Sequence, residues 1–237
     1  MTKYSEKIRA ACYVFLAFLI VVNFKGYAQK KDPDEILRRV KEKFSEIHDY
    51  SVKIHIKVDV DFIKMPETDA TFYFKQPDKI HIESEKFTLL PKQGLNFSPL
   101  GFFNEKHTAL YVNEDTVRGI NTTVIKVIPL NSESKIVLST LWIDKKRDVI
   151  LKAEYTTKPS GTYVIDFYYN KNSQKLILPD SLLFSFTIDR LNLPKGMNGN
   201  LDSGTKVKKG RSKGKVYIKY SDYKINQNLP DSLFIKK

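Results

Sequence analysis

The stretch that decides the fold is YSVKIHIKVDVDF, residues 50–62. Its even positions carry apolar or aromatic side chains, and its odd positions carry Ser, Lys, His or Asp. Alternation with a period of two is typical of a β-strand that has one buried face and one face in water. The pattern therefore predicts an antiparallel sheet with one covered side.

Strand-like patterns continue from this stretch toward the C-terminus. Pro77 interrupts the next one, FYFKQPDKIHIE (residues 72–83), and predicts a bulge or a strand break because proline has no N–H for the ladder. Further strands are expected at 109–117, 122–130, 135–144, 149–157, 162–170, 181–189 and 215–225, with turn residues between them. A sheet of so many strands must twist and coil. We therefore predict a mainly β (α+β) fold: an unclosed, strongly curved antiparallel sheet, or half-barrel, of about nine to eleven strands.

One amphipathic helix is expected before the first strand. Asp32-Pro33-Asp34-Glu35 supplies an N-cap, a proline at the first helical position and acids near the positive helix end. The apolar residues of the expected helix, 33–48, are Ile36, Leu37, Val40, Phe44 and Ile47. This helix is predicted to cover the concave face of the sheet. The core then either closes over the helix or leaves a cavity for an apolar ligand, and the pattern allows both.

The N-terminus predicts export. Three basic residues precede an apolar run at 10–24, and Gly26-Tyr27-Ala28 places small residues where a signal peptidase cleaves. Residues 1–28 are therefore interpreted as a cleaved signal peptide, with a retained anchor as the alternative. Lipidation at Cys12 is rejected because the apolar run follows this cysteine. Residues 29–237 form the single expected domain, located in the periplasm.

Composition and motifs argue against catalysis. The chain has one cysteine and four histidines, and it lacks a nucleophile elbow, a phosphate loop and a zinc-protease motif. We expect no enzyme activity, no cofactor and no metal. The net charge of +13 favours an anionic partner or simply solubility. Nucleic acid is not expected, because the basic segment lacks interleaved aromatic residues.

Two irregular segments interrupt the strands. Residues 85–105 are apolar and broken by Pro and Gly, so they form either a rim over a cavity or a buried connector. Residues 193–215 form an expected flexible basic loop. This loop is either simply solvated or a contact for an anionic membrane surface.

The ordered motifs resemble those of the LolA-like outer-membrane lipoprotein-sorting proteins. The resemblance spans the mature chain and rests on the order of DPDEILRRVKEKFSEIHDYS (32–51), FYFKQPDKIHIE (72–83), RGINTTVIKVIPL (118–130), LWIDKKRDVILKAEY (141–155) and KGKVYIKYSDYKINQNLPDSLF (213–234). It implies an unclosed barrel with a helical lid over an apolar cavity. It also implies a carrier that shelters acyl chains during passage through the periplasm.

The chain departs from the family pattern at its expected lid latch. The family's carriers commonly have an arginine before the proline of the strand-turn motif, and this chain has Gln76. The absence of a lipidation site favours the soluble carriers over the lipid-anchored receptors of the family. Related folds also serve as stress sensors and glycolipid carriers, which leaves the ligand open.

The predicted acyl cavity is lined by Ile36, Val40, Phe44, Ile54, Ile56, Val58, Phe72 and Phe74. Its rim is predicted at Phe87, Leu89, Phe102 and Phe103, and anionic head-group contacts at Lys208, Lys209, Arg211 and Lys213. The expected partners are lipoprotein or lipid acyl chains, an inner-membrane release complex, an outer-membrane acceptor and, transiently, a membrane surface. The protein is expected to be a monomer. A non-catalytic sensor or scaffold that binds a protein partner is the alternative.

Overall fold

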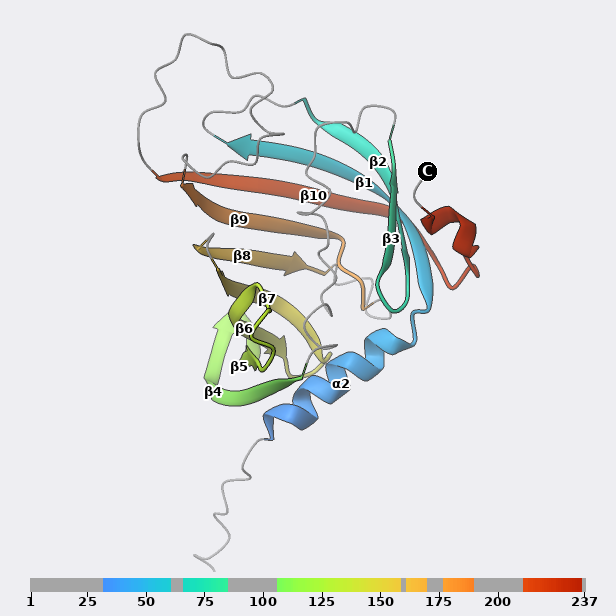
Figure 1. Ribbon diagram of the computed structural model, residues 1–237. Helices are drawn as coiled ribbons and strands as arrows, with labels where there is room; N and C mark the ends of the chain where they lie inside the picture. The colour runs from blue at the N-terminus through green and yellow to red at the C-terminus, as the bar shows by residue number, and fades with distance from the viewer. Residues whose placement is uncertain are drawn as a thin grey trace, which may run out of the picture. The chain divides into compact units, whose positions relative to one another are not determined.

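The computed structural model describes residues 32–60, 66–84, 106–158, 161–169, 177–189 and 211–235 (Figure 1). The chain divides into two units, Met1–Asp32 and Pro33–Lys237, and the described residues after Asp32 belong to the second. The predicted signal peptide lies outside the described residues. No helix in the described ranges is long and apolar enough to cross a membrane.

One helix precedes the strands in the described part of the second unit, and a short 3₁₀ helix follows them. The elements are α2 (Pro33–Ser45), β1 (Asp49–Val60), β2 (Thr68–Lys75), β3 (Lys79–Glu83), β4 (His107–Val117), β5 (Ile120–Pro129), β6 (Ile136–Asp144), β7 (Val149–Thr157), β8 (Gly161–Tyr168), β9 (Ser181–Asp189), β10 (Arg211–Ile225) and η3 (Asp231–Phe234).

The strands form one antiparallel sheet in the order β3-β2-β1-β10-β9-β8-β7-β6-β5-β4. Each neighbouring pair is antiparallel. Neighbours are consecutive strands except for β1 and β10, and the consecutive strands β3 and β4 lie at opposite edges. Strands β3 and β4 are the edges among the described residues, so the sheet is curved but not closed (Figure 1). The predicted fold class is confirmed.

The alternation in β1 places one face of the sheet toward the core, as predicted. Val52, Ile54 and Ile56 are buried, while Lys53 and Lys57 between them are exposed. The registers continue this inner face across all neighbours, because Ile54 lies opposite Ala70 of β2 and Tyr220 of β10. A large core cluster therefore runs along the inner face and includes residues of α2, and a smaller cluster with Phe44 and Phe74 lies at the end of the helix.

The structure differs from the expected elements at a few positions. Pro77 lies in the turn between β2 and β3, so the predicted break is a hairpin. Helix α2 ends at Ser45 and not at 48, although Ile47 is buried in a small cluster beside it. Ile128 of β5, in an apolar stretch of the sequence, is 38% exposed and pairs with the edge strand β4.

Strand registers place the start of β1, the β2–β3 turn and the β6–β7 turn at the same end of the sheet. Helix α2 enters β1 at this end, and its apolar residues pack on the inner face. Figure 1 shows α2 beside these strand ends. The helix therefore covers the concave side from one end.

A polar clamp fixes the junction between α2 and β1. The buried Asp49 carboxylate accepts hydrogen bonds from the backbone N–H groups of Gln227 at 2.8 Å and Leu229 at 3.1 Å. The Asn226 side chain donates to the Glu46 carbonyl at 3.0 Å and accepts from the His48 N–H at 2.8 Å. The chain after β10 therefore holds the C-terminal end of the helix in place.

Candidate functional site

The candidate site is the inner face of the sheet together with the apolar face of α2. Ile36, Leu37, Val40 and Phe44 are the buried residues of the helix. They fall at helical spacing, so one side of a 13-residue helix carries all of its core contacts. The other side is charged and exposed, which makes α2 a cover with only one attachment face.

The structure brings the predicted lining residues to this site. Six of the eight are buried, namely Ile36, Val40, Ile54 and Ile56 in the larger core cluster and Phe44 and Phe74 in the smaller one. The other two, Val58 and Phe72, are partly buried and pack against the larger cluster. The strand residues all lie on the inner face by register. The role of these residues in binding stays a prediction.

An aromatic row extends the inner face beyond the helix. Its ring centroids are 5.0 Å apart between Tyr155 and Tyr163, 5.3 Å between Tyr163 and Phe184, and 5.0 Å between Phe184 and Phe186. Tyr163 and Phe184 are only partly buried, although they face the inside of the sheet. Aromatic side chains thus offer apolar contact area that the described core does not fully cover.

A small pocket lies where α2 meets the β6–β7 end. Its volume is about 20 Å³, and it is lined by Val40, Lys43, Phe44, Asp148, Val149, Ile150, Tyr169 and Ile177. This volume accommodates one or two water molecules and not an acyl chain. Entry of a chain beside these residues therefore requires α2 to shift. The sequence did not single out Lys43, Asp148 or Tyr169 as site residues, because only the fold brings them together.

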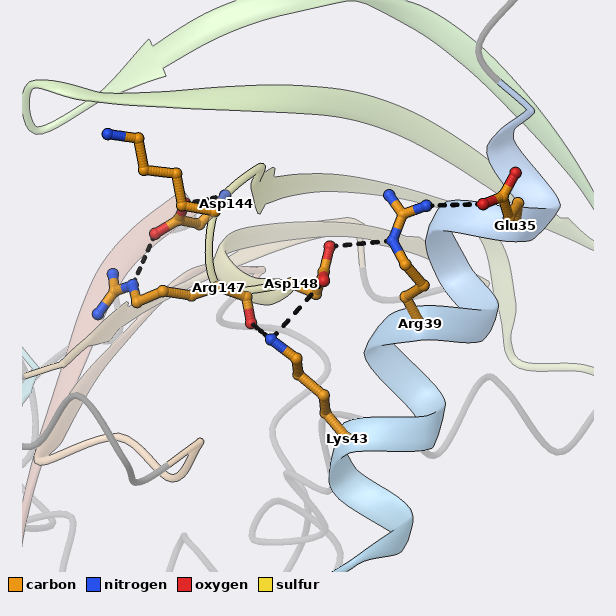
Figure 2. A network of polar contacts seen from close by, with 7 residues as sticks. Glu35, Arg39, Lys43, Asp144, Arg147 and Asp148 are labelled. Atoms are coloured by element: carbon orange, nitrogen blue, oxygen red, sulfur yellow. Dashed lines mark hydrogen bonds and ion pairs between the residues drawn. The ribbon is translucent and has the colours of Figure 1, made fainter.

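Polar contacts hold α2 against the β6–β7 turn at this pocket (Figure 2). Asp148 accepts from Arg39 Nε at 3.3 Å and pairs with Lys43 Nζ at 3.7 Å. Lys43 Nζ also donates to the Arg147 carbonyl at 2.6 Å. Asp148 has a positive φ of 52°, a conformation that Asp tolerates better than most residues. The turn thus places the Asp148 carboxylate within contact of two cations of the helix, Arg39 and Lys43.

The β6–β7 turn is itself rigidly built. The buried Asp144 carboxylate accepts from the Lys146 backbone N–H at 2.8 Å and from Arg147 Nε at 2.7 Å. These bonds satisfy a buried charge and close the turn locally. The helix therefore docks on a fixed partner, and the ion pairs to Asp148 are partly exposed and open to screening by salt.

Gln76, at the predicted lid-latch position, contacts the other end of the helix. Its Nε2 donates to the Ile47 carbonyl at 2.7 Å and to the Phe44 and Ser45 carbonyls at 3.3 Å. The Gln76 backbone N–H donates to the His48 carbonyl at 2.8 Å. A neutral amide thus satisfies the orphan carbonyls at the helix C-terminus, which a cationic side chain would also do.

Several predicted site residues lie outside the described residues. These are the rim residues Phe87, Leu89, Phe102 and Phe103 and the head-group residues Lys208 and Lys209. Arg211 is the first residue of β10, and Lys213, in the same strand, is exposed. Within the described ranges, no group of three or more His, Cys, Asp or Glu side chains is arranged to hold a metal ion.

Comparison with solved structures identifies the fold. A DUF1329 family protein from Desulfovibrio piger superposes with a TM-score of 0.55 at 12% identity, covering 86% of this chain and 98% of that one. A LolA superfamily protein from Nitrosomonas europaea gives a TM-score of 0.51 at 12% identity, over 84% of this chain and 97% of that one. The chain has a LolA-like fold. Neither a family model nor a curated protein matches the sequence, so the likeness lies in the LolA-like architecture alone.

Replacing Gln76 tests the contact at the helix C-terminus. Gln76→Glu keeps the size of the side chain but removes the donor and places a negative charge beside three carbonyl oxygens. We expect a loss of about 1–3 kcal/mol of unfolding free energy, measured by urea denaturation at pH 7. Gln76→Arg restores donors and is expected to stay near the wild type. Equal stability of Gln76→Glu and the wild type would contradict the assigned role.

Replacing Asp148 tests the attachment to the β6–β7 turn. Asp148→Asn removes the charge and still tolerates a positive φ. We expect a stability loss below about 1 kcal/mol. In the wild type, amide hydrogen exchange of α2 is expected to quicken with added salt, and in Asp148→Asn it is expected to be fast at every salt concentration.

Asp222→Asn is the matched control, because Asp222 also has a positive φ and pairs with a single lysine, Lys53, on the outer face. In Asp222→Asn, the amide hydrogen exchange of α2 is expected to show the same salt dependence as in the wild type. The attachment is disproved if Asp148→Asn shows the same salt dependence as the control.

Proposed function

We propose that the protein is an exported carrier that binds acyl chains of lipoproteins or lipids and moves them through the periplasm toward the outer membrane. It makes and breaks no covalent bond in this role. The observation that carries the proposal is a one-sided apolar helix over an aromatic inner face, attached elsewhere by a few polar contacts. The LolA-like fold supports it.

The free energy needed to move α2 off the inner face is comparable to the free energy gained when an acyl chain binds there. Moving α2 aside exposes four buried side chains, Ile36, Leu37, Val40 and Phe44, at about 1.5–3 kcal/mol each. An acyl chain of about sixteen carbons gains about 0.8 kcal/mol per CH₂ when it leaves water. The chain can therefore replace the contacts of the helix, and small differences decide between loading and release. A carrier needs this balance because it must also let its cargo go.

The residues proposed to line the acyl chain are those on the inner face and the helix, with Val58 and Phe72 as the partly buried positions where a chain first makes contact. Phe87, Leu89, Phe102 and Phe103 are proposed as the rim. Lys208, Lys209, Arg211 and Lys213 are proposed to meet anionic head groups. Donor and acceptor complexes in the two membranes are proposed partners.

A sensor or scaffold is the second candidate function. It is favoured by the pocket beside α2, whose volume of about 20 Å³ is too small for an acyl chain. Such a module would use the sheet to hold a protein partner. The two candidates differ in what accompanies the protein when it is purified from the periplasm, since a carrier retains lipid or lipoprotein and a sensor retains a stoichiometric non-lipidated protein.

Phe72→Asp is the variant that tests the carrier. Phe72 is a partly buried inner-face residue of β2, and a carboxylate there lacks a partner when an acyl chain covers it. We expect binding of a long-chain acyl ligand to weaken by about 3–5 kcal/mol. The measurement is the amount of lipid that organic solvent extracts from each purified protein, with the lipid identified by mass spectrometry.

Thr71→Asp is the control, because the neighbouring residue of β2 faces outward between Lys53 and Glu83. It is expected to retain the lipid of the wild type. Circular dichroism and the melting temperature establish that both variants are folded. Extraction of the same lipid from folded Phe72→Asp would refute the lining, and lipid-free wild type with a bound protein would favour the sensor.

A further inference from the structure

Exposed aliphatic side chains gather at one corner of the sheet, which we call the β4–β6 corner. Leu110 of the edge strand β4 is 47% exposed, and Ile128 of β5 is 38% exposed. Leu130, just after β5, is 63% exposed, and Val137 of β6 is 43% exposed. Most of the exposed large apolar side chains in the described part of the chain lie on these three strands or just beside them (Figure 1). A single exposed apolar residue is ordinary, whereas a group of them marks a contact surface.

The strand register brings these side chains together on the outer face. Leu110 and Ile128 are diagonal neighbours across the β4–β5 pair. Ala109 and Val127, which alternate with them along the two strands, are buried in the core cluster, so Leu110 and Ile128 point outward. The Leu130 N–H donates to the carbonyl of the residue before β4 at 2.8 Å, which holds Leu130 beside the start of that strand.

Lysines lie beside the aliphatic group. The ion pairs among the described residues include none of four lysines at this corner, namely Lys106, Lys126, Lys135 and Lys158. Lys126 lies directly opposite Leu110, and the Lys158 N–H donates to the Lys135 carbonyl at 2.9 Å. The connection between β5 and β6 adds a single acid, Glu133. The corner therefore combines aliphatic side chains with an excess of positive charge.

The corner shares one end of the sheet with the aromatic row of the inner face. Strands β4, β6 and β8 begin at this end, and β5 and β7 finish there. Tyr155 and Tyr163 lie near the same ends of β7 and β8, and Tyr163 is only partly buried. The exposed Lys213, near the start of β10, lies at this end as well. Helix α2 enters β1 at the opposite end. Apolar rings of the inner face are therefore located at the end that carries the corner.

We propose that the β4–β6 corner docks on the surface of an anionic phospholipid bilayer, with its aliphatic side chains at the head-group boundary and its lysines on lipid phosphates. The inference rests on the proposed carrier function and adds the face by which the carrier meets a membrane. Leu, Ile and Val supply apolar area without a polar group that needs a fixed partner, which suits a fluid lipid surface. Protein partners are instead held mainly by aromatic and arginine anchors in pockets.

The first test is flotation of the mature chain, residues 29–237, with vesicles of phosphatidylethanolamine and phosphatidylglycerol. Leu130→Glu places a carboxylate at the most exposed aliphatic position of the corner, and we expect about tenfold weaker binding. Ile235→Glu is the matched control, because Ile235 is 69% exposed and follows η3, which pairs with the β2–β3 turn at the opposite end. It is expected to bind as the wild type does.

The lysines are tested through the salt dependence of the same binding. Lys106→Gln/Lys135→Gln is expected to bind about tenfold more weakly at low salt and to lose part of the salt dependence. Lys41→Gln/Lys146→Gln is the control, because it removes two exposed lysines from α2 and the β6–β7 turn. Vesicles of phosphatidylcholine alone are expected to bind the wild type weakly, since they carry no net charge.

A fluorescent label reports insertion directly. Leu130→Cys and Ile235→Cys are each labelled with an environment-sensitive dye in the mature chain, which lacks Cys12. On the anionic vesicles, emission from the label at position 130 is expected to brighten and shift to the blue. Emission from the label at position 235 is expected to stay as it is in water. Melting temperatures establish that all variants are folded.

The outcomes separate the docking surface from the carrier. The docking surface is refuted if the label at position 130 stays in water, or if Leu130→Glu floats as well as Ile235→Glu. A concentration-dependent dimer that Leu130→Glu dissociates would also overturn it, because the corner would then bind a second copy of the chain. Wild type that yields lipid to organic solvent but binds no vesicles keeps the carrier and refutes the docking surface. Wild type that docks through the corner but yields no lipid refutes the carrier alone.

Discussion

The structure depends on the burial of one apolar helix face against the inside of a curved sheet. Strands β1 and β10, distant in sequence, pair within the sheet and bring the helix entry and the C-terminal segment together. Helix α2 contributes four buried side chains, and its polar attachments lie at Gln76 and at Asp148. Hydrophobic burial supplies most of its stability, since exposed ion pairs contribute less than about 1 kcal/mol each.

The strands could be predicted from the sequence because their signals are local. The period of two in β1 defines its inner face, and Pro77 marks the β2–β3 turn without any knowledge of the fold. The exposed Ile128 shows the limit of this reasoning, because its burial depends on how close its strand lies to an edge. Apolar neighbours in the sequence do not show how close a strand lies to the edge of the sheet.

The candidate site could be predicted only in its apolar part. The buried residues proposed as the lining follow from the same alternation and from the helical spacing of Val40 and Phe44. Asp148 could not be found in this way, since its role depends on which turn meets the helix. Gln76 was found through the family resemblance, and its contacts show that an amide serves where a charge was expected.

The central claim is that α2 must move for an acyl chain to enter. The direct measurement joins the helix to the β6–β7 turn in the variant Lys43→Cys/Asp148→Cys with a short bismaleimide. The protein used starts at residue 29 and so lacks the single native cysteine, Cys12. Methyl palmitate exchange with vesicles is then followed before and after linking. The account predicts that exchange stops in the linked protein and continues in the unlinked variant. Equal exchange in both would contradict it.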